Sequence, residues 1–201
     1  VSSLIVGVAA ADPGPGAILI AGVAGFAAGA MSMAAGEYVS VSSQSDIERA
    51  DISREKQALV DTPAEEEAEL ASIYESRGLS PATAALVARE LTEKDALAAH
   101  VREELGLSEV HSANPLQAAL ASGLTFTVAA ALPVIAAVLA PAGTTIPVVV
   151  VTTLICLAGL GALGAQAGGA PKLRPTLRVL FWGAAAMAVT ALVGLVFGVT
   201  A

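Results

Sequence analysis

The sequence predicts an all-α, polytopic membrane protein with five transmembrane helices, the first one truncated, and a three-helix cytoplasmic insert. The chain is 55% hydrophobic and only 14% charged, with a mean hydropathy of +0.73, whereas a soluble domain is about 25% charged. A bilayer core about 30 Å thick needs roughly 20 apolar residues in a helix. Four apolar runs meet that length: 16–43, 116–140, 144–168 and 177–201.

The opening run, 1–11, is about half a span, and we interpret it as a first helix that lacks its beginning. Clusters of proline and glycine at 12–16, 141–144 and 168–175 predict the turns between consecutive spans. The resulting division of the chain is 1–43 for helices 1 (partial) and 2, 44–113 for a cytoplasmic acidic metal-binding domain, and 114–201 for helices 3–5.

Charge is distributed very unevenly along the chain. Sixteen of the 18 acidic residues lie between Asp46 and Glu109, together with seven of the ten basic residues. This excess of negative charge disfavours nucleic acid as a partner and attracts cations. The remaining basic residues, Lys172, Arg174 and Arg178, follow the fourth span. By the positive-inside rule, we expect this cluster and the insert to be cytoplasmic.

The insert is predicted to consist of three helices. No helix breaker separates Met31 from Leu59, so the second span should continue out of the membrane as one helix over 16–59. Thr62 and Glu65 form a capping-box pattern that starts the next helix, which should end near Gly78. Ser80 and the proline after it predict a third helix that stops at 106. Apolar residues at helical spacing should pack the helices together: Leu70, Ile73, Tyr74, Leu86, Val87, Leu91, Leu97 and Val101.

Acidic residues gather in two clusters within this insert. Glu48, Asp51 and Glu55 share one face of the first soluble helix, while Glu65, Glu66, Glu67 and Glu69 crowd the start of the second. One such cluster alone is typical of a solvated surface or of acids near a helix N-terminus. Two clusters together favour neutralisation by divalent cations, for which carboxylate oxygens are good ligands.

His100 and Glu104 lie four residues apart near the end of the third helix. An imidazole combined with carboxylates suits a first-row transition metal better than calcium or magnesium. An exposed histidine without special function is the alternative interpretation.

The second span carries an ionisable residue, Glu37, four residues after Met33 and close to Met31. A charge inside a span indicates an ion or proton pathway, and methionine sulfur is a soft metal donor. Glu37 at the membrane interface and ordinary methionine packing are the alternatives. Gly25 and Gly29 form a GxxxG motif that would fit a dimer interface. Motifs of hydrolytic or redox enzymes were not found, so we expect no enzyme activity.

Several motifs together resemble the vacuolar iron transporter family. They are MSMAAGEYVSVSSQ at 31–44, DIER at 46–49, REK at 54–56, RGLSP at 77–81, KDAL at 94–97, EELG at 103–106 and NPLQAALAS at 114–122. The resemblance covers essentially the whole chain. It implies a homodimer with five spans per subunit that exchanges cytosolic Fe²⁺, often also Mn²⁺, for protons. It also implies a cytoplasmic insert that binds metal through glutamates.

Carried over by motif, the implied insert ligands are Glu55, Glu66, Glu69 and Glu104, with Met33 in the membrane path. The chain departs from the family pattern in three ways. Ala58 stands where a further glutamate is expected, and His100 with Val101 replaces a methionine pair. An aspartate of the first span would lie just upstream of Val1.

Two functions remain as expectations. The first is a homodimeric antiporter that exports Fe²⁺ or another divalent transition metal (Mn²⁺, Co²⁺ or Zn²⁺) in exchange for protons. The second is a non-conducting, membrane-anchored metal sensor or scaffold. The candidate metal ligands are Glu48, Asp51, Glu55, Glu65, Glu66, Glu69, His100 and Glu104, and the candidate translocation path is Met31, Met33 and Glu37. The Ala/Gly-rich composition and compact size favour a bacterial cell membrane over a vacuolar membrane.

Overall fold

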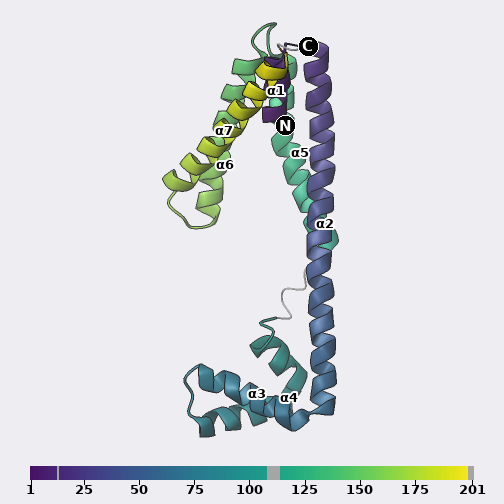
Figure 1. Ribbon diagram of the computed structural model, residues 1–201. Helices are drawn as coiled ribbons and strands as arrows, with labels where there is room; N and C mark the ends of the chain where they lie inside the picture. Colours follow the sequence, from purple (N-terminus) through teal and green to yellow (C-terminus); the bar gives the residue numbers. More distant parts are fainter. Residues whose placement is uncertain (13, 108–113, 199–201) are drawn as a thin grey trace. The chain divides into compact units, whose positions relative to one another are not determined.

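The computed structural model describes residues 1–12, 14–107 and 114–198, and every regular element within them is an α-helix (Figure 1). The all-α class is therefore confirmed. The helices are α1 (Ser2–Ala10), α2 (Pro15–Asp61), α3 (Pro63–Ser76), α4 (Pro81–Glu103), α5 (Pro115–Leu139), α6 (Thr145–Ala167) and α7 (Leu173–Gly198). His111 lies outside the described residues.

The chain divides into two compact units. The hydrophobic unit comprises Val1–Gly36 and Ala119–Ala201, and the insert unit comprises Glu37–Ala118. Helix α2 contributes to both units and is unbroken from Pro15 to Asp61, which confirms the single long helix expected over 16–59.

Among the described residues, four helices are long and apolar enough to cross a membrane: α2, α5, α6 and α7. Many of their large apolar side chains face outward, including Leu124, Val128, Ile155, Phe181 and Trp182. Water would penalise so much exposed apolar surface, whereas lipid tails would not. Helix α1 has nine residues, and the arrangement of five spans stays a prediction.

The core of the hydrophobic unit lies where α1 packs against α6 and α7, and where α6 packs against α7. Its buried side chains are Ile5, Val6, Val149 and Met187. Glycines allow these backbones to approach closely. A Cβ atom at Gly194 of α7 would collide with the backbone carbonyl of Gly7 in α1, and one at Gly161 of α6 would meet the backbone of Thr176. Small residues thus set the helix spacing here.

The glycines of the GxxxG motif are covered within the chain. Leu4 of α1 occupies the space above Gly25, and the ring of Phe126 from α5 occupies the space above Gly29. Close helix contact at this motif is as expected, but it serves packing inside one subunit. The interpretation of the motif as part of a dimer interface stays a prediction.

Helix α7 begins at Leu173, four residues earlier than the apolar run that predicts it. Arg174 and Pro175 consequently lie in its first turn instead of in a connecting loop. Proline is tolerated there because the first backbone N–H groups of a helix have no partner within the helix. Hydrophobicity alone placed the boundary at the start of the apolar run and missed the polar first turn.

In the insert unit, α3 packs against α4 around the buried residues Leu70, Ala88 and Ala99, with Tyr74 and Leu91 at the edge of this core. Leu86, expected in the core, is 55% exposed. Leu97 and Val101 line a hollow of about 580 Å³ beside α4. The smaller alanines pack between the helices in their place.

The two helix starts of the insert differ from each other. Ser80 caps α4 as expected, since its side chain accepts a hydrogen bond from the Thr83 backbone N–H at 3.3 Å. Thr62 precedes α3 but makes no side-chain cap. It is the only residue between α2 and α3, and its hydroxyl donates back to the Ala58 carbonyl at 3.3 Å. The predicted capping box is therefore wrong, because Thr62 also completes the last turn of α2.

Helix α4 contains a kink that the sequence analysis missed. Asp95 has φ −167° and ψ 91°, outside the helical region. Its Oδ1 atom accepts a hydrogen bond from the Ala98 backbone N–H at 3.0 Å, as an N-cap residue does. The last turns of α4 thus form a separately oriented segment.

The close approach of α1 and α7 leads to a stability prediction. Gly194→Ala should destabilise the full chain by about 1–3 kcal/mol, because the new methyl group meets a backbone that cannot rotate away. Gly164→Ala in α6 is the matched control, since nothing lies within 4 Å of a Cβ there. Thermal unfolding of both variants in detergent checks this. Equal melting temperatures for the two variants would contradict the packing described here.

Candidate metal centre

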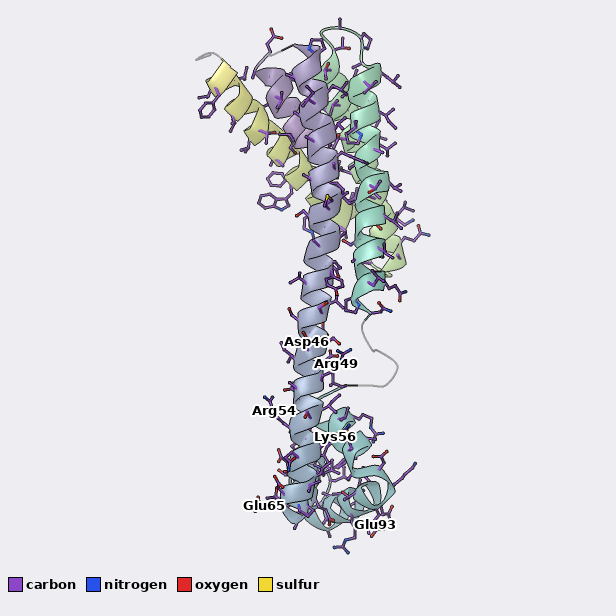
Figure 2. The ribbon with its side chains drawn as sticks, turned by 90° about the vertical axis from the view of Figure 1, so that its right-hand side faces the viewer. Asp46, Arg49, Arg54, Lys56, Glu65 and Glu93 are labelled. Atoms are coloured by element: carbon purple, nitrogen blue, oxygen red, sulfur yellow. The ribbon has the colours of Figure 1, made fainter. Side chains whose placement is uncertain are left out.

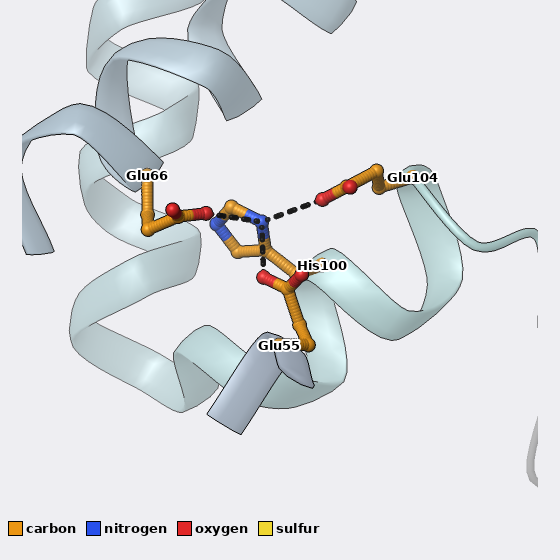
Figure 3. A group of neighbouring side chains, drawn as sticks. All are labelled: Glu55, Glu66, His100 and Glu104. Atoms are coloured by element: carbon orange, nitrogen blue, oxygen red, sulfur yellow. Dashed lines mark hydrogen bonds and ion pairs between the residues drawn. The ribbon is translucent and has the colours of Figure 1, made fainter. Parts of the chain in front are cut away.

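Four side chains from three helices converge within the insert unit (Figure 3). Glu55 comes from α2, Glu66 from α3 and His100 from the last segment of α4, while Glu104 follows directly at the α4 C-terminus. One potential ligand atom from each residue lies within 4.8 Å of the others. Two ligand atoms on one small metal ion are about 3–4 Å apart, so this grouping has the dimensions of a metal site.

The imidazole of His100 lies in the middle of the group. Its Nδ1 atom is 3.0 Å from Glu55 Oε1, 3.3 Å from Glu104 Oε2 and 3.9 Å from Glu66 Oε2. The His100 side chain is fully buried, and those of Glu55 and Glu66 are 8% and 12% exposed. Glu104 is 30% exposed and forms the solvent-facing side of the cluster.

Two polar atoms of the cluster lack hydrogen-bond partners among the described residues. They are Oε1 of Glu55 and Nε2 of His100, and both are buried. Although Glu55 Oε1 is close to His100 Nδ1, that nitrogen is aligned for a hydrogen bond with Glu104 instead. A buried carboxylate oxygen without a donor costs about 1–3 kcal/mol or more. A bound cation would remove this cost.

Burial raises the pKa of Glu55 above its ordinary value, and the nearby Glu104 carboxylate raises it further. His100 acts in the opposite direction, whereas Glu66 and Glu69 add smaller repulsions. The direction of this shift indicates that the negative form of Glu55 is disfavoured in the metal-free insert. Metal and proton would therefore compete for the same oxygen.

Neighbouring residues hold the last segment of α4 in place. Arg77, just after α3, forms an ion pair with Glu103, and its Nη2 atom also donates to the Glu103 carbonyl at 3.2 Å. The guanidinium lies 5.4 Å from the ring centroid of Tyr74. Hydrogen bonds from Arg102 and Arg77 lower the pKa of Glu103. Glu103 is thus a charge-paired anchor, while adjacent Glu104 belongs to the cluster.

The other candidate ligands lie outside this group of four. Glu65 and Glu69 are exposed, and Glu69 affects the site only through its charge on Glu55. Glu48 accepts a hydrogen bond from Gln44 at 3.0 Å, and Asp51 pairs with Arg54. Figure 2 shows Glu65 and Arg54 on the outside of the insert unit.

Arg77, Glu103 and Asp95 position the site, and their roles were not predicted from the sequence. Asp95 is of the N-cap residue type, which was a usable signal for the kink. Nothing in the spacing alone distinguishes Glu103 from Glu104, because their difference depends on the partner that Arg77 provides.

The candidate translocation residues lie on α2. Met31 is 75% and Met33 is 47% exposed, and Glu37 is also exposed. The hydroxyl of Ser122 in α5 donates to the Met33 carbonyl at 3.5 Å, and Ala34 packs against Gly123. Met33 is thus placed beside α5, with its side chain partly free.

The fold is that of a helical, multi-pass membrane protein, and its cluster of three carboxylates and one imidazole has the composition of a possible metal site. The family model described as "VIT family" matches residues 1–195. The chain therefore belongs to the VIT family, which confirms the resemblance found in the sequence.

Curated relatives agree with this assignment. The chain is 44% identical over 191 residues to "Vacuolar iron transporter" of Acanthamoeba castellanii, covering 94% of this chain and 73% of the relative. It is 34% identical to "Vacuolar iron transporter homolog 2" of Oryza sativa subsp. japonica, covering 94% of this chain and 79% of the relative. "VIT-like transporter 1b" of Glycine max is also 34% identical, with 94% and 66% covered.

The burial of Glu55 leads to a prediction about pH. Because the folded pKa of Glu55 is raised, its contribution to stability is full below the ordinary carboxyl pKa and is lost as pH rises through the raised value. With chelator present, Glu55→Gln should increase the free energy of unfolding at neutral pH by about 1–3 kcal/mol and so raise the melting temperature of the full chain. The variant should also be stabilised less than the unchanged chain when the pH is lowered mildly.

Glu93→Gln, an exposed residue of α4, removes the same charge and is the control. It should leave the pH dependence of the melting temperature unchanged. A lower melting temperature for Glu55→Gln at neutral pH without metal would mean that His100 fully compensates the Glu55 charge.

Proposed function

We propose that this protein is a metal transporter that exports Fe²⁺, and also Mn²⁺, from the cytoplasm in exchange for protons. The observation that carries the proposal is the convergence of Glu55, Glu66, His100 and Glu104 in a chain with membrane-spanning helices. The VIT family assignment and the names of the relatives support metal transport as its purpose. An enzyme activity is not part of this proposal.

The proposed topology has five spans, with α1 as part of the first, and a cytoplasmic insert over 44–113. Lys172, Arg174 and Arg178 near the start of α7 support a cytoplasmic side for the α6–α7 turn. We propose a homodimer in the lipid bilayer. The host membrane is a bacterial cell membrane or, as the relatives' names suggest, a vacuolar membrane.

In this proposal, the insert captures the ion and the second span passes it on. Carboxylates strip water from a divalent ion by replacing its oxygen ligands. Met33 and Glu37, one turn apart on α2, would then offer a soft sulfur and a carboxylate inside the span. Protons return by competing with metal for the same carboxylates. Met31, two residues before Met33 on α2, would line the same path.

The second candidate is a membrane-anchored metal sensor or scaffold whose spans conduct nothing. One observation favours it: all four cluster residues belong to one compact unit, which suits binding without transport. The two functions differ in what Met33 and Glu37 do. Transport requires them, whereas a sensor binds metal without them.

Reconstitution of the full chain in proteoliposomes tests the proposal. A transporter should take up Fe²⁺ and move protons in the opposite direction. Met33→Ala with Glu37→Gln should reduce the uptake rate about tenfold or more, because a desolvated ion is left without ligands in the span. Metal binding measured in detergent should stay within about twofold of the unchanged chain, since Glu55 and its neighbours are intact.

Glu93→Gln again serves as the control and should transport normally. Metal binding without uptake in the unchanged chain would reject transport and favour the sensor. Uptake of Fe²⁺ without any proton flux would reject the exchange mechanism alone.

A further inference from the structure

The described residues place a single nitrogen ligand at the candidate metal centre. Its three other donors are carboxylate oxygens, from Glu55, Glu66 and Glu104. Oxygen donors bind Mg²⁺, Ca²⁺ and Mn²⁺ well, whereas an imidazole adds most to the binding of ions later in the first transition row. The identity of the fourth donor therefore determines how strongly the site discriminates between these ions by affinity.

His100 is placed to bind the same ion as the three carboxylates. Its Nδ1 lies 3.0 to 3.9 Å from one oxygen of each. Two donor atoms that share one ion at about 2.0–2.2 Å are roughly 3–4 Å apart, so Nδ1 and these oxygens can bind the same ion. The ring is completely buried, so it has no solvent-exposed position to which it can withdraw.

Contacts on both sides of His100 fix the backbone that carries it. His100 follows Asp95, which caps the last segment of α4, and precedes Glu103, which Arg77 anchors. Ala99, its neighbour, is buried against Leu70. A fixed backbone and a fully buried ring restrict where the donor atom can lie.

We propose that His100 is the specificity-determining residue of the insert, and that its Nδ1 makes the site prefer Fe²⁺ over Mn²⁺ and exclude Mg²⁺ and Ca²⁺. This inference rests on the proposed function, because it concerns the ion that the same site captures. The order of divalent ion affinities at a nitrogen-containing site rises from Mn²⁺ through Fe²⁺ to Co²⁺. Replacing the nitrogen donor should reduce the differences in affinity between these ions.

Anaerobic titration of the full chain in detergent with Fe²⁺, Mn²⁺ and Ca²⁺ tests the proposal. The unchanged chain should bind Fe²⁺ more tightly than Mn²⁺, with Ca²⁺ weakest. His100→Gln should weaken Fe²⁺ binding about tenfold more than Mn²⁺ binding, because it removes a nitrogen donor and no charge of a carboxylate. The Fe²⁺ to Mn²⁺ affinity ratio is the decisive quantity.

Glu69→Gln is the matched control for a general effect on the site. This exposed carboxylate acts on Glu55 through charge alone, so its removal should weaken all three ions to a similar extent. If His100→Gln behaves like Glu69→Gln, with all ions weakened equally, His100 has only a structural role and the inference is overturned.

A spectroscopic measurement on the unchanged chain covers the case in which His100→Gln does not fold. Pulsed electron paramagnetic resonance of bound Mn²⁺ should show coupling to a ¹⁴N nucleus of the imidazole. Mn²⁺ bound without any nitrogen coupling overturns the inference while the proposed function stands. Failure of the unchanged chain to bind any of the ions overturns both.

Discussion

The carboxylates of Glu55, Glu66 and Glu104 surround a buried imidazole, and their mutual repulsion in a poorly hydrated place must be offset by positive charge. The insert unit is organised around this requirement. Helices α2, α3 and α4 each supply part of the cluster, so a cation bound there joins all three. Without it, protonation of Glu55, whose pKa is raised, relieves part of the repulsion, and the packing of Leu70, Ala88 and Ala99 holds the helices together.

The hydrophobic unit follows a different rule. Its helices gain little from burying apolar surface, because lipid is as apolar as their side chains, and close backbone contact takes over. Gly7 and Gly194 let α1 and α7 meet at their backbones, and Phe126 and Leu4 fill the spaces above Gly29 and Gly25. The same chain therefore uses alanine and glycine for contact in lipid, and ion pairs such as Arg77–Glu103 for contact in the charged insert.

The sequence predicted the long-range plan of the fold better than its local details. The apolar runs identified α2, α5, α6 and α7, and the lack of a breaker identified α2 as one helix. The kink at Asp95 and the role of Thr62 depend on which backbone groups compete for one side chain. Similar competition decides whether a Ser, Thr or Asp residue caps a helix or completes the previous one.

The candidate site shows a similar limit. The eight acidic and histidine residues proposed as ligands include all four that converge, but the helical spacing could not separate them from Glu48, Asp51, Glu65 and Glu69. Spacing places residues on a face of one helix, whereas a site depends on which faces of three helices meet. The role of Glu103 as an anchor was hidden for that reason, since its partner Arg77 lies 26 residues earlier in the chain.

The adjacent acids Glu103 and Glu104 have opposite tasks, and this places a limit on insertions and deletions in the chain. Each residue of an α-helix turns the next by about 100°. Adding one residue between Asp95 and Glu103 would put the anchoring acid where Glu104 now lies, and removing one would put the ligating acid where Glu103 now meets Arg77. A point substitution here changes one contact, whereas a change of length displaces both acids from their present partners. The spacing of this short segment should therefore tolerate less variation than its composition.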